Sequence, residues 1–214
     1  MRQWILIGLF FYSMAIFAAP IGTVLFTMDK VIAEQNHVQR TITRGSILNG
    51  GDIIITGPSG QAKIKYNNGT LVSINPNSHY QVSSVGADSA KQYDATLSVG
   101  SIAYSSSGKK KQGTLHTPVV ALAILGTEFT VTVSPPPYTV NLDVQSGQVQ
   151  VGNGVVVNGG FNAVILPNGH VNVTPDSKHN DPINNVLVVD SQLIALAATP
   201  AHVSGLAFLT ITCP

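Results

Sequence analysis

Short runs of alternating apolar and polar residues, each ended by turn residues, fill the middle of the chain. Ile53 to Thr56 is β-branched throughout, Ala62 to Tyr66 alternates with two lysines, and Thr70 to Ile74 alternates again. Alternation with a period of two predicts strands that bury one face. Asn67-Asn68-Gly69 separates the last two runs and predicts a hairpin, because Asn and Gly tolerate a positive φ.

The same pattern continues on both sides of this stretch. Residues 22–47 predict two or three short strands with a polar turn around Glu34 to His37. Gly86 to Tyr93 has no strong pattern and is expected to be a polar loop. Two longer alternating runs, Ala95 to Tyr104 and Val140 to Val151, are each divided by a single glycine, which is a weak internal repeat.

Glycine corners then recur every few residues between Gly152 and Val173. Short strands with such corners suit a solenoid or a tightly wound barrel better than a sandwich of long strands. Val119 to Val133 is the most apolar part of the expected domain and should lie in its core. Only 10% of the residues are charged, and there are 20 glycines. The sequence therefore predicts an all-β, solenoid-like domain over residues 19–174.

The N-terminal residues have the composition of a secretory signal peptide. Arg2 precedes an almost continuous apolar run, and Ala18 supplies the small residue expected before a cleavage site. We therefore predict a signal peptide at residues 1–18 and a mature protein in the periplasm or outside the cell. The alternative is an uncleaved membrane anchor, because the apolar character continues through Phe26.

A sharp change of composition follows the predicted β domain. Residues 175–185 are polar and are predicted to be a linker. Residues 186–214 are predicted to form a C-terminal tail, in which apolar residues at helical spacing indicate a short amphipathic helix. Leu206 to Thr212 then has the pattern of a strand.

Charge and cysteine content exclude several classes of function. The formal net charge is +1, which does not indicate binding to nucleic acid or to an anionic membrane. We expect membrane contact only if the N-terminal segment is uncleaved. Cys213 is the only cysteine, so an intramolecular disulfide and a cysteine-based metal site are excluded, while a disulfide to another chain stays open.

A series of turn and core motifs extends from about Ile21 to Val173. They are Arg44-Gly45-Ser46, Gly51-Asp52 with Thr56-Gly57, Ala62, Asn68-Gly69-Thr70, Pro76-Asn77-Ser78, Leu97 with Gly100, Thr117-Pro118, Gly126-Thr127-Glu128-Phe129, and Val144 with Gly147. In order and spacing these motifs resemble the FecR domain of bacterial extracytoplasmic proteins. The resemblance implies an all-β, solenoid-like domain in the periplasm or outside the cell, without catalytic residues.

The chain departs from the family pattern in three respects. Asn68 stands where the family commonly has aspartate, and Leu125 stands where a basic residue is frequent. Family members that signal across the inner membrane also carry a cytoplasmic segment that binds a sigma factor. Here the apolar segment begins at Trp4, so we do not expect sigma-factor regulation in that form.

Two acids lie inside the matching motifs and are the first candidates for chemistry. Asp52 and Glu128 are the residues that a glycosidase-type acid/base pair would use. A structural role is favoured, because Gly-Asp before a strand commonly forms a turn in which the carboxylate accepts backbone N–H groups. The histidines show no paired metal-binding spacing: His37, His79, His116, His170, His179 and His202. We predict no catalytic, cofactor or metal site.

The first hypothesis is therefore an exported, non-enzymatic binding, sensing or scaffold module of the bacterial cell envelope. Its partner would be another envelope protein or a glycan. A polysaccharide-active enzyme on a β-solenoid is the first alternative. A surface protein that assembles through strand edges or through Cys213 is the second.

Overall fold

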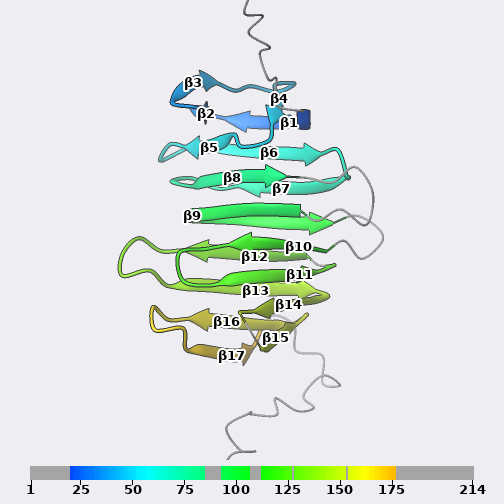
Figure 1. The fold of residues 1–214 in the computed structure, drawn as a ribbon, viewed down its shortest axis with the longest axis vertical. Helices are drawn as coiled ribbons and strands as arrows, with labels where there is room; N and C mark the ends of the chain where they lie inside the picture. The colour runs from blue at the N-terminus through cyan, green and yellow to red at the C-terminus, as the bar shows by residue number, and fades with distance from the viewer. Residues whose placement is uncertain (1–19, 85–92, 107–111, 127, 153, 177–214) are drawn as a thin grey trace, which may run out of the picture. The chain divides into compact units, whose positions relative to one another are not determined.

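The computed structural model describes five segments of the chain, which contain strands and turns but no α-helix (Figure 1). These segments are residues 20–84, 93–106, 112–126, 128–152 and 154–176. Within them, no helix is long and apolar enough to cross a membrane. The prediction of an all-β domain is confirmed. The predicted signal peptide, the C-terminal helix and strand, Cys213 and nearly all of the predicted linker lie outside the described residues.

The strands form two sheets, and β9 (Tyr93–Ser106) belongs to both. Sheet A contains, in spatial order, β4 (Ile47–Asn49), β1 (Pro20–Met28), β6 (Gln61–Tyr66), β7 (Thr70–Ile74), the second half of β9, β12 (Glu128–Val133), β13 (Val140–Ser146), β16 (Phe161–Ile165) and β17 (Val171–Pro175). Sheet B contains β3 (Val38–Thr41), β2 (Val31–Gln35), β5 (Ile53–Thr56), β8 (His79–Ser84), the first half of β9, β10 (Gln112–His116), β11 (Ala121–Leu125), β14 (Gln148–Val151) and β15 (Val155–Asn158).

Neighbouring strands pair antiparallel, except that β9 and β10 run parallel. Figure 1 shows the strands stacked in chain order, from β1 to β4 at one end to β15 to β17 at the other. The solenoid interpretation stays a prediction, since a regular solenoid would stack successive coils in parallel.

The core lies between the two sheets. Alternate residues of most strands are buried, and those of both sheets join in one apolar cluster rich in Val, Ile and Leu. Leu122, Ile124, Phe129, Val131 and Val133 are all in this cluster, which confirms the core position predicted for that apolar segment. The alternation of apolar and polar residues therefore arises because one face of each sheet is buried against the other sheet.

Buried aromatic side chains occupy the middle of this core. Tyr66 and Tyr93 make an edge contact with ring centroids 6.0 Å apart, and Tyr93 and Tyr104 make another at 5.2 Å. The Tyr104 ring stacks on Phe129 at 5.0 Å. Tyr80 hydrogen-bonds to Tyr93 through their hydroxyl groups. We call Tyr66, Tyr80, Tyr93 and Tyr104 the tyrosine cluster; Tyr93 had been expected in a loop, but it begins β9 and is fully buried.

The chain passes from sheet B to sheet A inside β9, at Gly100. Its φ of +98° is one that residues with a side chain rarely adopt. A Cβ at this position would also lie 2.6 Å from Cβ of Ser78. The Ser78 hydroxyl accepts a hydrogen bond from the Ser101 N–H at 2.9 Å, so the crossing is held against the neighbouring β7 to β8 corner. Gly147, the glycine of the second predicted repeat, also has a positive φ at a change of sheet.

Candidate functional site

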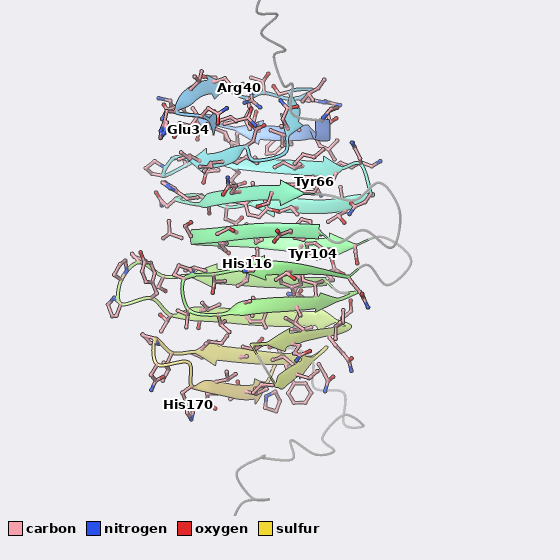
Figure 2. All side chains as sticks on the ribbon, in the orientation of Figure 1. Glu34, Arg40, Tyr66, Tyr104, His116 and His170 are labelled. Atoms are coloured by element: carbon pink, nitrogen blue, oxygen red, sulfur yellow. The ribbon has the colours of Figure 1, made fainter. Side chains whose placement is uncertain are left out.

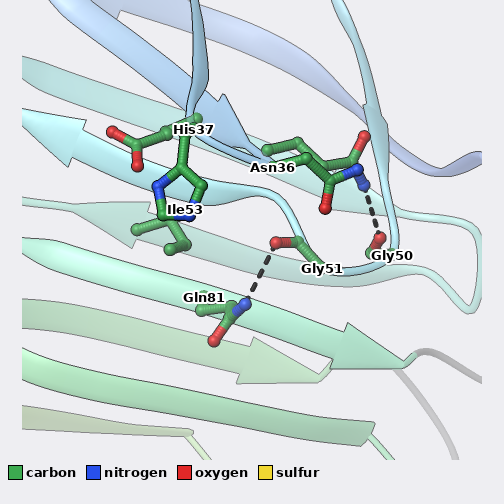
Figure 3. Close-up of a pocket in the computed structure, with 8 residues that line it drawn as sticks. Asn36, His37, Gly50, Gly51, Ile53 and Gln81 are labelled. Carbon is green, nitrogen blue, oxygen red and sulfur yellow. Dashed lines mark hydrogen bonds between the residues drawn. The ribbon is translucent and has the colours of Figure 1, made fainter.

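A pocket of about 390 Å³ opens on the outer face of sheet B, among the first strands of the stack (Figure 3). Its floor follows the cross-strand register, in which Glu34 pairs with Ile53 and Ile53 with Gln81. Residues from two turns complete it. The lining residues are Glu34, Gln35, Asn36, His37, Gly50, Gly51, Ile53 and Gln81.

The first wall is the two-residue turn between β2 and β3. Asn36 and His37 have φ values of +51° and +64°. Positive φ at both central residues is typical of a type I′ turn, whose twist matches that of the two strands it joins. This confirms the polar turn predicted around Glu34 to His37. It also places an amide and an imidazole beside the pocket.

The second wall is the turn from Asn49 to Asp52, between β4 and β5. Asp52 is only 1% exposed. Its Oδ2 accepts the Asn49 N–H at 2.8 Å, and the Arg40 guanidinium donates to both carboxylate oxygens, at 3.0 Å and 2.5 Å. This two-point contact is the strong form of an ion pair. The hydrogen bond to Asp52 raises the pKa of Arg40, so the guanidinium stays charged throughout the usual pH range. Figure 2 shows Arg40 at this end of the stack.

Two glutamines attach the same turn to strands on either side of it. Gln35 Nε2 donates to the Gly50 carbonyl at 2.9 Å, and Gln81 Nε2 donates to the Gly51 carbonyl at 3.0 Å (Figure 3). The Gly51 N–H in turn donates to the Val82 carbonyl at 2.8 Å. Gly51 has a φ of +89°, so glycine is needed for the turn to make these contacts. The wall is therefore fixed by β2, β3 and β8 together.

The two acids proposed as a catalytic pair are not brought together. Asp52 begins the approach to β5 in sheet B, whereas Glu128 is an exposed residue that begins β12 in sheet A. The preferred structural role of Asp52 agrees with its geometry, because it accepts a backbone N–H inside a turn. Glu128 pairs in register with Ser105 and Ser146.

The described histidines are also distributed over separate elements. His37 lies in the pocket wall, His79 on β8, and His170 in the turn before β17. His116 Nε2 lies 3.2 Å from Asp94 Oδ1 on the half-exposed surface of sheet B. Among the residues that the structure describes, no three His, Cys, Asp or Glu side chains gather as metal ligands would. His179 and His202 lie outside the described residues.

Sequence reasoning missed the residues that hold the pocket together. These residues belong to no motif: Arg40, Gln35 and Gln81. Each binds the Asn49 to Asp52 turn from a distant position in the chain, and the bonded residues are separated by 12, 15 and 30 positions respectively. The sequence indicated this site only through Gly50-Gly51-Asp52, which predicts a tight turn but not the side chains that bind it.

Comparison with known proteins shows a similarity to one family in the central part of the chain. The model of the FecR protein family matches residues 52–150, from the Asp52 turn to β14. The resemblance predicted from about Ile21 to Val173 is thus confirmed over this shorter range. A search of the curated proteins gives no significant match.

Two solved structures are similar to part of this chain. Both are crystal structures of a candidate anti-sigma factor from Parabacteroides distasonis, at 13% sequence identity and with TM-scores of 0.49 and 0.50. In each case the match covers 58% of this chain and 59% of the other, so this chain spans less than two thirds of that protein. At this identity the match with a TM-score of 0.50 shows a similar fold and nothing about a partner.

Proposed function

Because residues 52–150 match the FecR family model, we propose that this protein is an exported, non-enzymatic module of the bacterial cell envelope that acts by binding a partner. The FecR match is the observation that carries the proposal. The binding it requires has a physical basis in the pocket, one wall of which is the turn that ends at Asp52, the first matched residue. In a sensing or regulatory role, a ligand bound to the domain would change the affinity of the domain for its partner protein.

Binding is favoured over cleavage of a polysaccharide by the state of the two motif acids. Asp52 is buried, is bound by Arg40 and lies in the turn before β5 of sheet B, whereas Glu128 lies in sheet A. A retaining or an inverting glycosidase needs two carboxyl groups facing one bond, about 5 to 10 Å apart. Neither acid is arranged for that role.

Export is tested with Cys213, the only cysteine of the chain. We expect a membrane-impermeant maleimide to label Cys213 in cells of a Gram-negative host that make the full-length protein and have only their outer membrane permeabilised. N-terminal sequencing should find Ala19 first, because the expected cleavage follows Ala18. Carbonate extraction should then leave the protein in the soluble fraction.

A Cys213→Ser variant is the matched control and should stay unlabelled. Labelling only after lysis would place the domain in the cytoplasm and refute the proposal. A labelled protein that retains Met1 and stays with the membrane would keep the envelope assignment but replace the cleaved signal peptide by an anchor.

A further inference from the structure

The chemistry of the pocket on sheet B indicates what kind of ligand it would take. We propose that it binds a neutral saccharide, such as one or two sugar units of an envelope glycan. The biological setting of this inference rests on the proposed function, but its geometry does not. The pocket volume of about 390 Å³ lies in the range of small-molecule sites, about 300 to 1,000 Å³.

The carboxamides of Gln35 and Gln81 are the main recognition groups. Each uses one N–H to hold a glycine carbonyl, at 2.9 Å and 3.0 Å respectively. Among the described residues, the other N–H and the Oε1 atom of each carboxamide make no hydrogen bond, so they can serve a ligand. A carboxamide that both donates and accepts suits a hydroxyl group, which does the same. Because the two side chains are already held in place, little conformational entropy is lost on binding.

The charge of the pocket argues for a neutral ligand. Glu34 is the acid that lines it, and no lysine or arginine is among its lining residues. Arg40 is close in sequence to the lining residue His37, but its guanidinium forms an ion pair with Asp52. Glu34 accepts a hydrogen bond from Gln39 at 2.9 Å and keeps further acceptor capacity for a hydroxyl group. An anionic ligand would meet repulsion from this carboxylate with no cation to compensate it.

The floor supplies the apolar contact that a sugar ring needs. Ile53 lies between Glu34 and Gln81 in the cross-strand register and is half-buried. The C–H face of a pyranose can rest on such a side chain while its hydroxyl groups reach the polar groups around it. The pocket therefore has an apolar floor with polar groups at its rim, which is the usual arrangement in small-molecule sites.

The test is a titration of the full-length protein with maltose, cellobiose and N,N′-diacetylchitobiose, followed by calorimetry and by ligand-observed NMR. We expect at least one of these neutral disaccharides to bind. Ile53→Trp should fill the pocket and weaken binding by about tenfold or more. Ile55→Trp is the matched control, since Ile55 is the next half-buried residue on the same face of β5 and does not line the pocket. It should change affinity by less than about twofold.

A second variant tests the role of charge. Glucuronic acid should bind more weakly than glucose to the wild type, and Glu34→Gln should reduce that difference by about fivefold or more. If a folded wild-type protein binds none of the three disaccharides, or if Ile53→Trp and Ile55→Trp bind equally well, the inference is wrong. Cys213 labelling would still be seen in that case, so the envelope assignment is tested separately.

Discussion

The strands before β9 and the strands after it build the same two sheets by different means. After β9 the chain alternates regular hairpins between the sheets: β10 to β11 in sheet B, β12 to β13 in sheet A, β14 to β15 in sheet B and β16 to β17 in sheet A. Before β9 it changes sheet after one or two strands. The second region is therefore regular, and the first is irregular.

Positive-φ glycines lie at corners of both regions, but the two regions differ in the side chains that act at their changes of sheet. In the irregular region, side chains attach the turns, as Arg40 does with Asp52 and Thr56 does with the Ser78 N–H at 2.9 Å. In the regular region, changes of sheet fall at Gly126 and Gly147, which have positive φ. The described residues after β9 include no lysine or arginine. A pocket with fixed polar groups thus occurs in the region whose turns are held by side chains, because the same bonds that shape the turn also orient the groups around it.

The largest expected effect comes from high pH, which acts on the tyrosine cluster at the junction of the two regions. Burial raises the pKa of Tyr66, Tyr80, Tyr93 and Tyr104 above the ordinary value of about 10. The folded protein therefore keeps these protons while the unfolded chain loses them. Stability is full below about pH 10 and falls above it, by about 1.4 kcal/mol per pH unit for each tyrosine.

Phenolate absorbance and far-ultraviolet circular dichroism, followed together from neutral pH upward, measure this effect. We expect the phenolate signal of the cluster to appear only as the strand signal is lost, by about pH 11. If the tyrosine cluster ionises at about pH 10 while the protein keeps its strand signal, these hydroxyl groups are not buried in the core.

The next effect is expected at Gly100, where β9 joins the two regions. Gly100→Ala places a side chain at a φ of +98° and against the Ser78 side chain, whose Cβ would be 2.6 Å away. Backbone strain and overpacking should together lower the free energy of unfolding by about 3 kcal/mol or more.

Gly154→Ala is the control for that substitution, because a Cβ there would meet no atom within 4 Å and the backbone has no positive φ. Urea unfolding of both variants provides the measurement. Equal stabilities would mean that the crossing in β9 is not a rigid joint.

The smallest effect is expected at the ion pair that holds the pocket wall. Arg40→Met leaves the buried Asp52 carboxylate with only the Asn49 N–H, and it should lower the melting temperature through a loss of about 2 kcal/mol. The exposed Arg44 is the control, and Arg44→Met should change stability by less than about 0.5 kcal/mol. If the two variants have the same melting temperature, the ion pair between Arg40 and Asp52 does not stabilise this turn.

Local patterns predicted the individual strands well. The bounds of β5 and β7 agree with the predicted runs, and Asn67-Asn68-Gly69 does form the hairpin between β6 and β7. The positive φ falls on Gly69, however, while Asn68 instead accepts the Thr70 N–H at 2.9 Å. Tyr93 was assigned to a loop because the residues before it have no pattern, and only its burial among the other tyrosines reveals it as part of β9.

The sequence by itself determined that this chain is all-β, where several strands lie, and which face of most strands is buried, because a period of two is a local property. It also carried the FecR motifs. Only the tertiary structure decided which sheet each strand joins, that Arg40 reaches Asp52, and that Gln35 and Gln81 meet one turn from two strands. Those contacts join residues far apart in the chain, and the geometry of two sheets packed on a common core selects them.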